Sequence, residues 1–261
     1  MSKSVAPPVP VPGLASDPLR KLDAAVIAPR PTRRYRAIAF QAYVLSAAVV
    51  FVVLAFVAHT VAYFPIDLTI THAVQAEHGI VFDRLMYAVS WVGFLPQGAY
   101  LAAAVVVILA LAGLRWEAVS TLFAILSTGV GALVKLVVFR PRPSADLVYV
   151  FRQLPSSGFP SGHVVSTTAF CGFLVFLIYT LLKPSPGRTA MLIVLITLIS
   201  LMGLSRIYLG QHWFSDVMGA YLFGSLWLVL SIRFYRWGKD RFFVHQPVAP
   251  AAPAASEMGT A

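Results

Sequence analysis

The sequence predicts an all-α integral membrane protein, a six-helix bundle with an amphipathic interfacial segment between its first two spans. Of the 261 residues, 59% are hydrophobic and only 11% are charged, whereas a soluble domain carries roughly 25% charged residues. The mean hydropathy is +0.79. Six apolar stretches of roughly 20 residues each have the length that a bilayer core requires.

The six expected spans are joined by short links and flanked by polar ends. They cover about residues 37–64, 96–114, 116–139, 161–182, 189–209 and 212–234. Residues 37–241 therefore form one membrane domain. Residues 1–36 are rich in proline and basic residues without an apolar core, so we expect a disordered tail rather than a cleaved signal peptide. We expect a second disordered, Pro/Ala-rich tail over residues 242–261.

The segment 65–95 differs from the spans because it mixes apolar residues with charged ones such as Asp67 and Asp83. This pattern favours one or two amphipathic helices at the membrane interface. In the alternative, residues 81–95 begin a long, bent second span.

Charge predicts the orientation. The net charge is +10, and the basic residues flank apolar spans. Membrane orientation and contact with anionic lipid headgroups explain this charge better than nucleic-acid binding does. Basic residues before the first span predict cytoplasmic termini in a cell (plasma or inner) membrane. Cys171 is the one cysteine, which excludes an intrachain disulfide. The sequence has no metal-ligand spacing, so no metal or cofactor is expected.

Strict alternation of six spans brings distant polar residues to one face. Lys135 ends the third span, His163 begins the fourth, Arg206 ends the fifth and His212 begins the sixth. All four then lie near the outer interface. An excess of cations on that side indicates anion binding, because basic residues otherwise collect on the cytoplasmic side.

Lys135 and Arg142 are seven residues apart, about two helical turns. An arginine fork and a lysine point charge suit phosphate oxygens. Either residue alone could equally be a cation that snorkels from a span end to the interface.

The sequence from Pro160 to His163 has the features of a helix start. Proline suits the first helical turn, and Gly162 lets a ligand approach the backbone N–H groups that bind anions there. The Ser161 hydroxyl can add a donor, and His163 can protonate a leaving oxygen. The simpler alternative is an ordinary helix start with an interfacial histidine.

His212 and Asp216 are four residues apart on one helix, so their side chains can meet. A carboxylate that holds one imidazole nitrogen leaves the other nitrogen basic, as in an activated histidine nucleophile. Arg206 precedes them across the turn at Gly210 and can reach the same phosphate. The alternative is a pair that only satisfies polar groups in the membrane.

These segments form the pattern K-x(6)-R-P, then P-S-G-H, then S-R-x(5)-H-x(3)-D. The pattern resembles the three-part signature of the type 2 phosphatidic acid phosphatase superfamily. The matched positions are Lys135, Arg142, Pro143, Pro160, Ser161, Gly162, His163, Ser205, Arg206, His212 and Asp216. The six-span layout extends the resemblance to about residues 37–236, and the tails are not covered.

The resemblance implies a role for each site residue. His212 would be the nucleophile that forms a phosphohistidine, Asp216 would orient it, and His163 would be the general acid. The residues that would hold the phosphoryl oxygens are Lys135, Arg142, Ser161, Gly162 and Arg206. No metal would be required. The expected partners are the membrane and a phospholipid or polyprenyl phosphate or diphosphate.

The sequence leaves several functions open. The favoured one is hydrolysis of undecaprenyl diphosphate at the outer face, with phosphatidylglycerophosphate and phosphatidic acid as close competitors. Phosphate transfer to a lipid acceptor would use the same nucleophile. A transporter or flippase is less well supported because the polar cluster lies at span ends rather than at the midplane, and a soluble haloperoxidase is disfavoured by the apolar spans. Arg140 and Arg152 lie outside the signature, where they could contact a second phosphate or lipid headgroups. Oligomeric state is not predicted.

Overall fold

The structure, a computed structural model, describes residues 30–94 and 96–243. Every regular element in these residues is a helix, which confirms the all-α prediction. The helices are α2 (Arg30–Thr60), α3 (Pro65–Ala76), α4 (Ile80–Val92), α5 (Gln97–Leu111), α6 (Arg115–Ile125), α7 (Ser127–Val138), α8 (Gly162–Leu181), α9 (Pro186–Tyr208) and α10 (Phe214–Phe242). They fall into two units that divide within α2, residues 1–46 and 47–261. The first unit contributes only part of α2 to the described residues, and the second contains the helices from α3 to α10.

The expected tails lie largely outside the described residues. Of the predicted N-terminal tail, residues 1–29 are not described, and α2 already begins at Arg30. At the other end α10 continues to Phe242, eight residues past the expected end of the last span, and residues 244–261 are not described. The tail boundaries therefore stay predictions.

Five membrane-spanning helices match the expected spans in length and composition. They are α2, the collinear pair α6 and α7, α8, α9 and α10. The remaining span differs from the expectation. Helix α5 has only 15 residues, about 22 Å, which is too short for a bilayer core of about 30 Å. Together α4 and α5 pass as one apolar span, bent by 56°. The alternative in which residues 81–95 begin a bent second span therefore fits the structure better.

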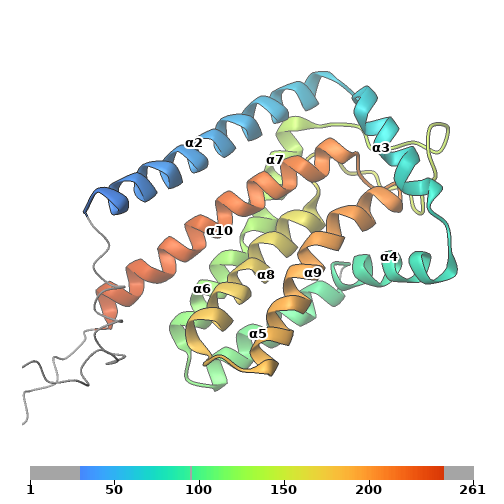
Figure 1. Cartoon of the computed structure of the whole chain (residues 1–261). Coiled ribbons are helices and arrows are strands. Elements are labelled where there is room, and N and C mark those ends of the chain that lie inside the picture. Colours follow the sequence, from blue (N-terminus) through green and yellow to red (C-terminus); the bar gives the residue numbers. More distant parts are fainter. Residues whose placement is uncertain (1–29, 95, 244–261) are drawn as a thin grey trace, which may run out of the picture. The chain divides into compact units, whose positions relative to one another are not determined.

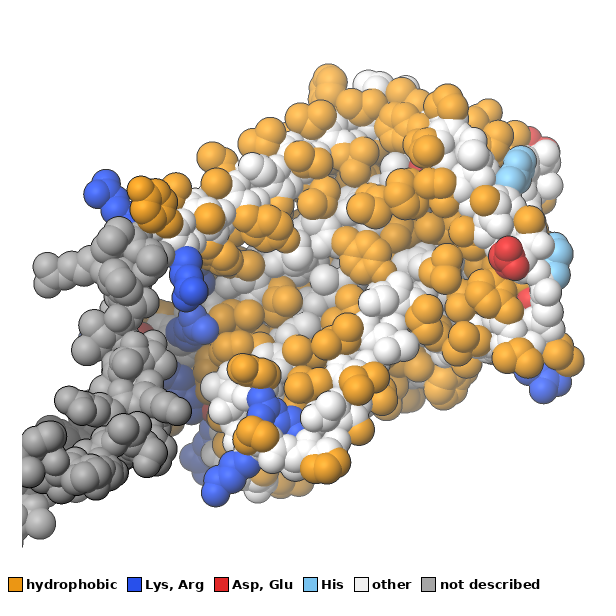
Figure 2. Space-filling model, viewed as in Figure 1, with side chains coloured by type: hydrophobic (Ala, Val, Ile, Leu, Met, Phe, Trp, Pro, Cys, Tyr) orange, Lys and Arg blue, Asp and Glu red, His pale blue; other side chains and the backbone are white. Residues whose placement is uncertain are grey.

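Helix α8 lies among the other spans and contacts α6, α7, α9 and α10 (Figure 1). It is apolar nearly all round, as expected of a helix enclosed by neighbours. Val165, Met202 and Val217 join α8, α9 and α10 in one fully packed cluster. Apolar side chains also cover the flanks of the helices (Figure 2). An apolar exterior of this extent suits lipid, so the chain is a multi-pass membrane protein.

Helix α3 has the reverse of a soluble protein's polarity. Its buried residues are the polar Asp67, Thr71 and Gln75, whereas Ile66 is 53% exposed. The helix packs against α9 and α10 at the end where α10 begins (Figure 1). Gln75 donates to the carbonyls of Tyr149 and Tyr208 at 2.8 and 2.9 Å. Helix α3 therefore closes this end of the bundle with polar contacts and turns apolar residues outward.

The turn from α9 to α10 requires a glycine. Gly210 has a φ of +60°, in the left-handed region that other residues rarely adopt. A Cβ at this position would also overlap the Tyr149 carbonyl. This tight turn places His212 directly between the end of α9 and the start of α10.

Candidate active site

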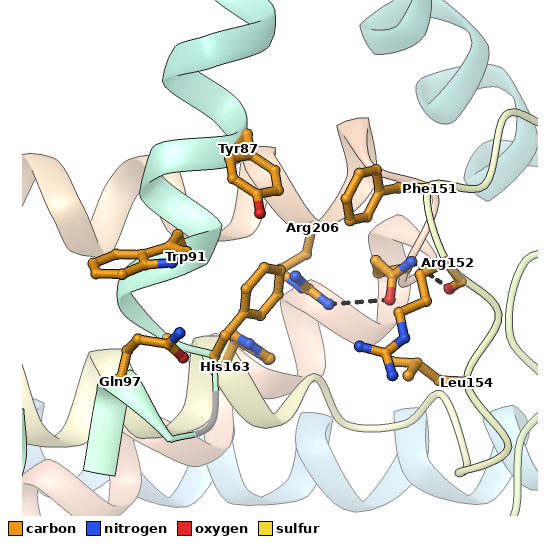
Figure 3. A pocket seen from close by; sticks show the side chains of 11 residues that line it. Tyr87, Trp91, Gln97, Phe151, Arg152, Leu154, His163 and Arg206 are labelled. Carbon is orange, nitrogen blue, oxygen red and sulfur yellow. Dashed lines mark hydrogen bonds between the residues drawn. The ribbon is translucent and has the colours of Figure 1, made fainter. Parts of the chain in front are cut away.

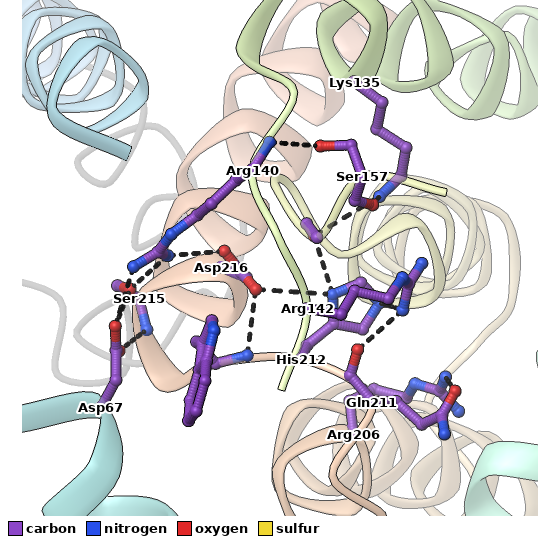
Figure 4. A network of polar contacts seen from close by, with 12 residues as sticks. Asp67, Lys135, Arg140, Arg142, Ser157, Arg206, Gln211, His212, Ser215 and Asp216 are labelled. Atoms are coloured by element: carbon purple, nitrogen blue, oxygen red, sulfur yellow. Dashed lines mark hydrogen bonds and ion pairs between the residues drawn. The ribbon is translucent and has the colours of Figure 1, made fainter. Parts of the chain in front are cut away.

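The three polar segments meet at the end of the bundle that α3 closes (Figure 4). Lys135 lies in the last turn of α7, and Arg142 follows in the link to α8. Ser161 is the N-cap residue of α8, although its side chain makes no capping hydrogen bond, and Arg206 lies in the last turn of α9. His212 precedes α10, whose first turn carries Asp216. The alternation of spans predicted this convergence.

His212 is buried, with 1% of its surface exposed. Its Nδ1 lies 2.8 Å from the carbonyl oxygen of Gly158, which can only accept, so Nδ1 carries the hydrogen. Its Nε2 lies 3.1 Å from Nη1 of Arg142, which can only donate. The partners thus assign one tautomer, with a lone pair on Nε2.

The surroundings of His212 favour the neutral imidazole. Burial is the largest cause that lowers its pKa well below the ordinary value, and the charges of Arg142, Lys135 and Arg206 lower it further. A neutral ring with a lone pair on Nε2 is the form that a nucleophile requires, and here Arg142 donates to that lone pair.

Asp216 does not hold His212 in the way that the spacing suggested. Its Oδ2 lies 3.7 Å from Nδ1, beyond hydrogen-bonding distance, and accepts the backbone N–H of Trp213 at 2.9 Å. Its Oδ1 accepts from Arg140 at 2.7 Å. The direct orienting partner of the imidazole is the Gly158 carbonyl, and Asp216 acts on the ring as a nearby charge.

Arg140 does not lie where a substrate phosphate could reach it. Its side chain is buried and forms ion pairs with Asp67 at 2.9 Å and Asp216 at 2.7 Å. Asp67 was not a candidate site residue in the sequence, where it appeared only as one charged residue of the interfacial segment. The suggestion that Arg140 binds a second phosphate or a lipid headgroup is therefore wrong.

Lys135 and Arg142 both hold the link before α8. The Lys135 ammonium donates to the carbonyl of Ser157 at 2.9 Å. Arg142 donates to the carbonyls of Ser156 and Gln211, each at 2.7 Å. These cations therefore position the segment that supplies the Gly158 carbonyl, and Arg142 also contacts His212.

Arg206 is held from two sides. Nη1 donates to the Ser90 hydroxyl at 3.1 Å, and Nη2 lies 3.4 Å from the side-chain oxygen of Gln211. Ser205 exchanges a hydrogen bond with Ser90 at 2.9 Å. Ser205 of the signature thus positions Ser90, which in turn holds Arg206. No sequence motif pointed to Ser90 or Gln211.

Three buried polar atoms from signature residues lack a hydrogen-bond partner among the described residues. They are Oγ of Ser161, Nε2 of His163 and Nε of Arg206. A Cβ added at Gly162 would meet only Lys135, at 3.8 Å, so the space above the helix start is open. Buried polar groups are rarely left unpaired in proteins. A phosphate fits here, because it could accept from these donors and from the N–H groups at the start of α8.

A cavity of about 630 Å³ opens onto His163 and Arg206 (Figure 3). Its walls include the aromatic side chains of Tyr87, Trp91 and Phe151 and the guanidinium of Arg152. His212 does not line the cavity, which is bounded on that side by Gln211. A phosphoryl group that enters must therefore displace the contact between Arg142 and His212 to reach Nε2.

The break between α4 and α5 forms a wall beside His163. The ring of Phe94 meets the imidazole edge-on with centroids 5.3 Å apart, and it lies 5.5 Å from the guanidinium of Arg206. A Cβ at Gly93 would lie 2.6 Å from Cδ2 of His163. The sequence did not identify either residue, because each looks like an ordinary part of an apolar segment.

Comparison with known proteins finds the same architecture elsewhere. Residues 117–240 match the model of the PAP2 superfamily. One similar solved structure is described as the first transmembrane PAP2-type phosphatidylglycerolphosphate phosphatase from Bacillus subtilis, with 23% identity and a TM-score of 0.64 over 74% of this chain and 96% of that chain. Another is LpxE from Aquifex aeolicus, with 20% identity and a TM-score of 0.52 over 66% of this chain and 98% of that chain. A comparison with curated proteins finds no match. At these identities the two structures establish the shared fold.

Proposed function

Since the chain is a multi-pass membrane protein of the PAP2 superfamily, we propose that it is a metal-independent lipid phosphatase with His212 as the nucleophile. The observations that carry this proposal are three donors without a hydrogen-bond partner among the described residues, on Ser161, His163 and Arg206, and the buried imidazole of His212, whose pKa is lowered by burial and nearby cations. This combination offers a binding site for a phosphoryl group and a group that can attack it.

In the first chemical step, Nε2 of His212 attacks the phosphorus. The bond between phosphorus and the leaving oxygen breaks, and His163 donates a proton to that oxygen. The product is a phosphohistidine and a free alcohol or a lipid monophosphate.

In the second step, His163 removes a proton from water, which attacks the phosphohistidine. The bond between phosphorus and nitrogen breaks, and inorganic phosphate leaves. Nε2 regains its lone pair and His163 regains its proton, so the enzyme returns to its starting state. Arg142, Arg206 and Lys135 would stabilise the charge on the phosphoryl oxygens in both steps.

Among substrates we favour undecaprenyl diphosphate. Arg152 lines the cavity together with Arg206, so a second cation is available for a second phosphate. The aromatic walls suit an apolar chain near the headgroup. Phosphatidylglycerophosphate is a strong competitor, because a structural relative is described as a phosphatase of that lipid. Phosphatidic acid is the third candidate.

The test is phosphate release by the protein purified in detergent, with each of the three lipids in turn. We expect release by the wild type and none by His212→Ala. His78→Ala is the matched control, because His78 is exposed in the link between α3 and α4 and should leave activity unchanged. The relative rates would identify the substrate. Vanadate, a phosphate mimic, should inhibit.

Two outcomes would contradict the proposal. Equal phosphate release by wild type and His212→Ala would exclude His212 as the nucleophile. Release only after a lipid acceptor is added would favour phosphate transfer over hydrolysis.

A further inference from the structure

Arg140 is the most extensively bonded charged residue of the site, although it lies outside the signature. Its side chain donates to Asp67, Ser215 and Asp216 at 2.9, 2.7 and 2.7 Å. Its Nε donates to the carbonyls of Val61 and Ala62 at 3.3 and 3.1 Å. Only 1% of its surface is exposed. All three guanidinium nitrogens therefore have protein acceptors, which commits the buried Arg140 side chain to the fold around Asp216.

Asp67 completes the cluster from α3. Its Oδ2 accepts from Arg140 and from the Ser215 hydroxyl at 2.8 Å, and its Oδ1 accepts the backbone N–H of Ser215 at 2.7 Å. Oδ2 also accepts the backbone N–H of Phe64 at 2.9 Å, at the start of α3. Asp67 thus fixes both the guanidinium and the first turn of α10.

The cluster holds two buried carboxylates and one guanidinium. Asp67 and Asp216 are each 0% exposed. Charges taken out of water are costly, and replacing a buried ion pair by apolar residues is often neutral or stabilising. A role in stability alone is therefore a weak explanation for burying these three charges. An electrostatic effect on the adjacent imidazole of His212 would explain why they lie at this position.

His212 faces charges from every element around it. Lys135 of α7, Arg142 of the following link, Arg206 of α9 and the ionisable His163 of α8 all act on it. Asp216 of α10 is the carboxylate that approaches it, at 3.7 Å. When Nε2 bonds to phosphorus the ring becomes cationic, and Asp216 is the group placed to offset that charge.

We propose that Arg140 and Asp67 are positioning residues that set where the Asp216 carboxylate lies and how much negative charge it presents to His212. Arg140 holds Oδ1 so that Oδ2 points at the imidazole, and Asp67 in turn balances Arg140. The effect of these residues on catalysis rests on the proposed function. Their effect on the charge around His212 can be tested without any substrate.

The direct test is the titration of His212 in purified protein. With histidine labelled by ¹³C, the resonances of the six histidines can be followed against pH, and His212→Gln identifies the signal of His212. Arg140→Gln removes the positive charge that offsets Asp216, so we expect the pKa of His212 to rise. Asp67→Asn removes a negative charge and leaves Arg140 unbalanced, so we expect the pKa of His212 to fall.

Glu117→Gln is the matched control. Glu117 is also a buried carboxylate in an ion pair, with Lys239 at 2.7 Å, but it joins α6 to the far end of α10. Its substitution should leave the titration of His212 unchanged. A purely structural role for Arg140 and Asp67 predicts loss of stability without opposite shifts.

Activity supplies the second readout. Arg140→Gln should lower kcat by about 10- to 100-fold, by analogy with residues that orient the ligands of a metal site, with KM for a soluble phosphate ester changed much less. Arg140→Lys retains the charge but loses the two-sided fork, so it should keep the wild-type titration with a reduced kcat.

Unchanged titration of His212 in both charge variants, or shifts in the same direction, would overturn the proposal. If Arg140→Gln does not fold, the other two variants still test the proposal. Asp67→Asn should lower the pKa of His212, and Arg140→Lys should leave it unchanged. If the wild type releases no phosphate from any lipid, the proposed function fails, whereas opposite shifts would still uphold the electrostatic part.

Discussion

At the scale of single residues, the two ring nitrogens of His212 have partners of opposite kind. Nδ1 donates to a neutral carbonyl, and Nε2 accepts from the cation of Arg142. The same guanidinium that occupies the lone pair can turn to the oxygens of an incoming phosphate. When Arg142 turns to the substrate phosphate, the lone pair on Nε2 of His212 would become exposed. The phosphate would neutralise the charge of Arg142 at the same time.

The first prediction concerns pH. The pKa of His212 is lowered well below its ordinary value by burial and by neighbouring cations, so the imidazole stays neutral, and active, down to that lowered pKa. The acid limb of kcat/KM should therefore lie below about pH 6.5, the value for an unperturbed histidine. The measurement is a pH profile with a soluble phosphate ester. An acid limb at or above that value would contradict the assignment of His212 as the neutral nucleophile.

The second prediction concerns Gly158. A Cβ here would lie 3.0 Å from Oδ2 of Asp216 and 3.3 Å from the carbonyl of Pro141. Gly158→Ala should displace the carbonyl that orients His212, and kcat should fall by about 10-fold or more, because a shift of about 1 Å in a reacting group can cost about 100-fold. Gly129→Ala, where nothing lies within 4 Å, is the control and should retain full activity. Equal activity of the two variants would show that the position of this carbonyl is not critical.

At the scale of helices, length and composition were sufficient to find most spans. Five apolar runs were long enough to identify without any knowledge of their neighbours. The bend between α4 and α5 was not predictable in the same way. Residues 80–92 carry charged residues, as an interfacial helix does, and it is the structure that shows α4 and α5 to form one bent apolar segment.

The third prediction tests the wall that this bend forms. Gly93→Ala would push against Cδ2 of His163, which lies 2.6 Å from the new atom. If His163 is the general acid, the variant should lose much more activity toward alkyl phosphates than toward p-nitrophenyl phosphate, whose leaving group needs little protonation. His163→Gln should give the same pattern. A uniform loss on both substrates would indicate that the bend affects binding instead.

The candidate site was predictable to the extent that it follows the signature. The donor residues and His212, the proposed nucleophile, lie close to helix ends, where span alternation alone brings them together. The partners of Asp216 were not predictable. Arg140 pairs with Asp216 directly, and Asp67, which is 73 residues from Arg140, pairs with Arg140 and not with Asp216. Only tertiary packing brings the three residues together, and no spacing rule relates the three positions.

At the scale of the whole molecule, the membrane unit has two different ends. Lys and Arg side chains lie near the link from α8 to α9, whereas histidine and acidic side chains lie near α3 (Figure 2). The cations at helix ends away from the site are Arg115, Lys183, Arg188, Arg236, Lys239 and Arg241. Basic residues favour the cytoplasmic side, so we propose that the site faces outward and that both chain ends lie inside.

The fourth prediction tests this orientation. Cys171 is the one cysteine of the sequence, so Cys171→Ala gives a background without thiols. In that background His78→Cys, in the link from α3 to α4, should react with a membrane-impermeant maleimide in intact cells. Lys183→Cys, in the link from α8 to α9, should react only after permeabilisation. The opposite pattern would place the site on the cytoplasmic side.

The Asp67–Arg140–Asp216 cluster also has a consequence for biosynthesis. The ribosome delivers its members far apart in time, because α3 emerges early, Arg140 follows α7, and Asp216 arrives with the last helix. Chains assemble from their N-terminal part onward during synthesis. Until α10 inserts, Arg140 can pair with Asp67 alone and His212 has no fixed place. If His212 is the nucleophile, as proposed, the capacity for chemistry would be acquired last, and a nascent chain that stops short of α10 would be inactive in the membrane.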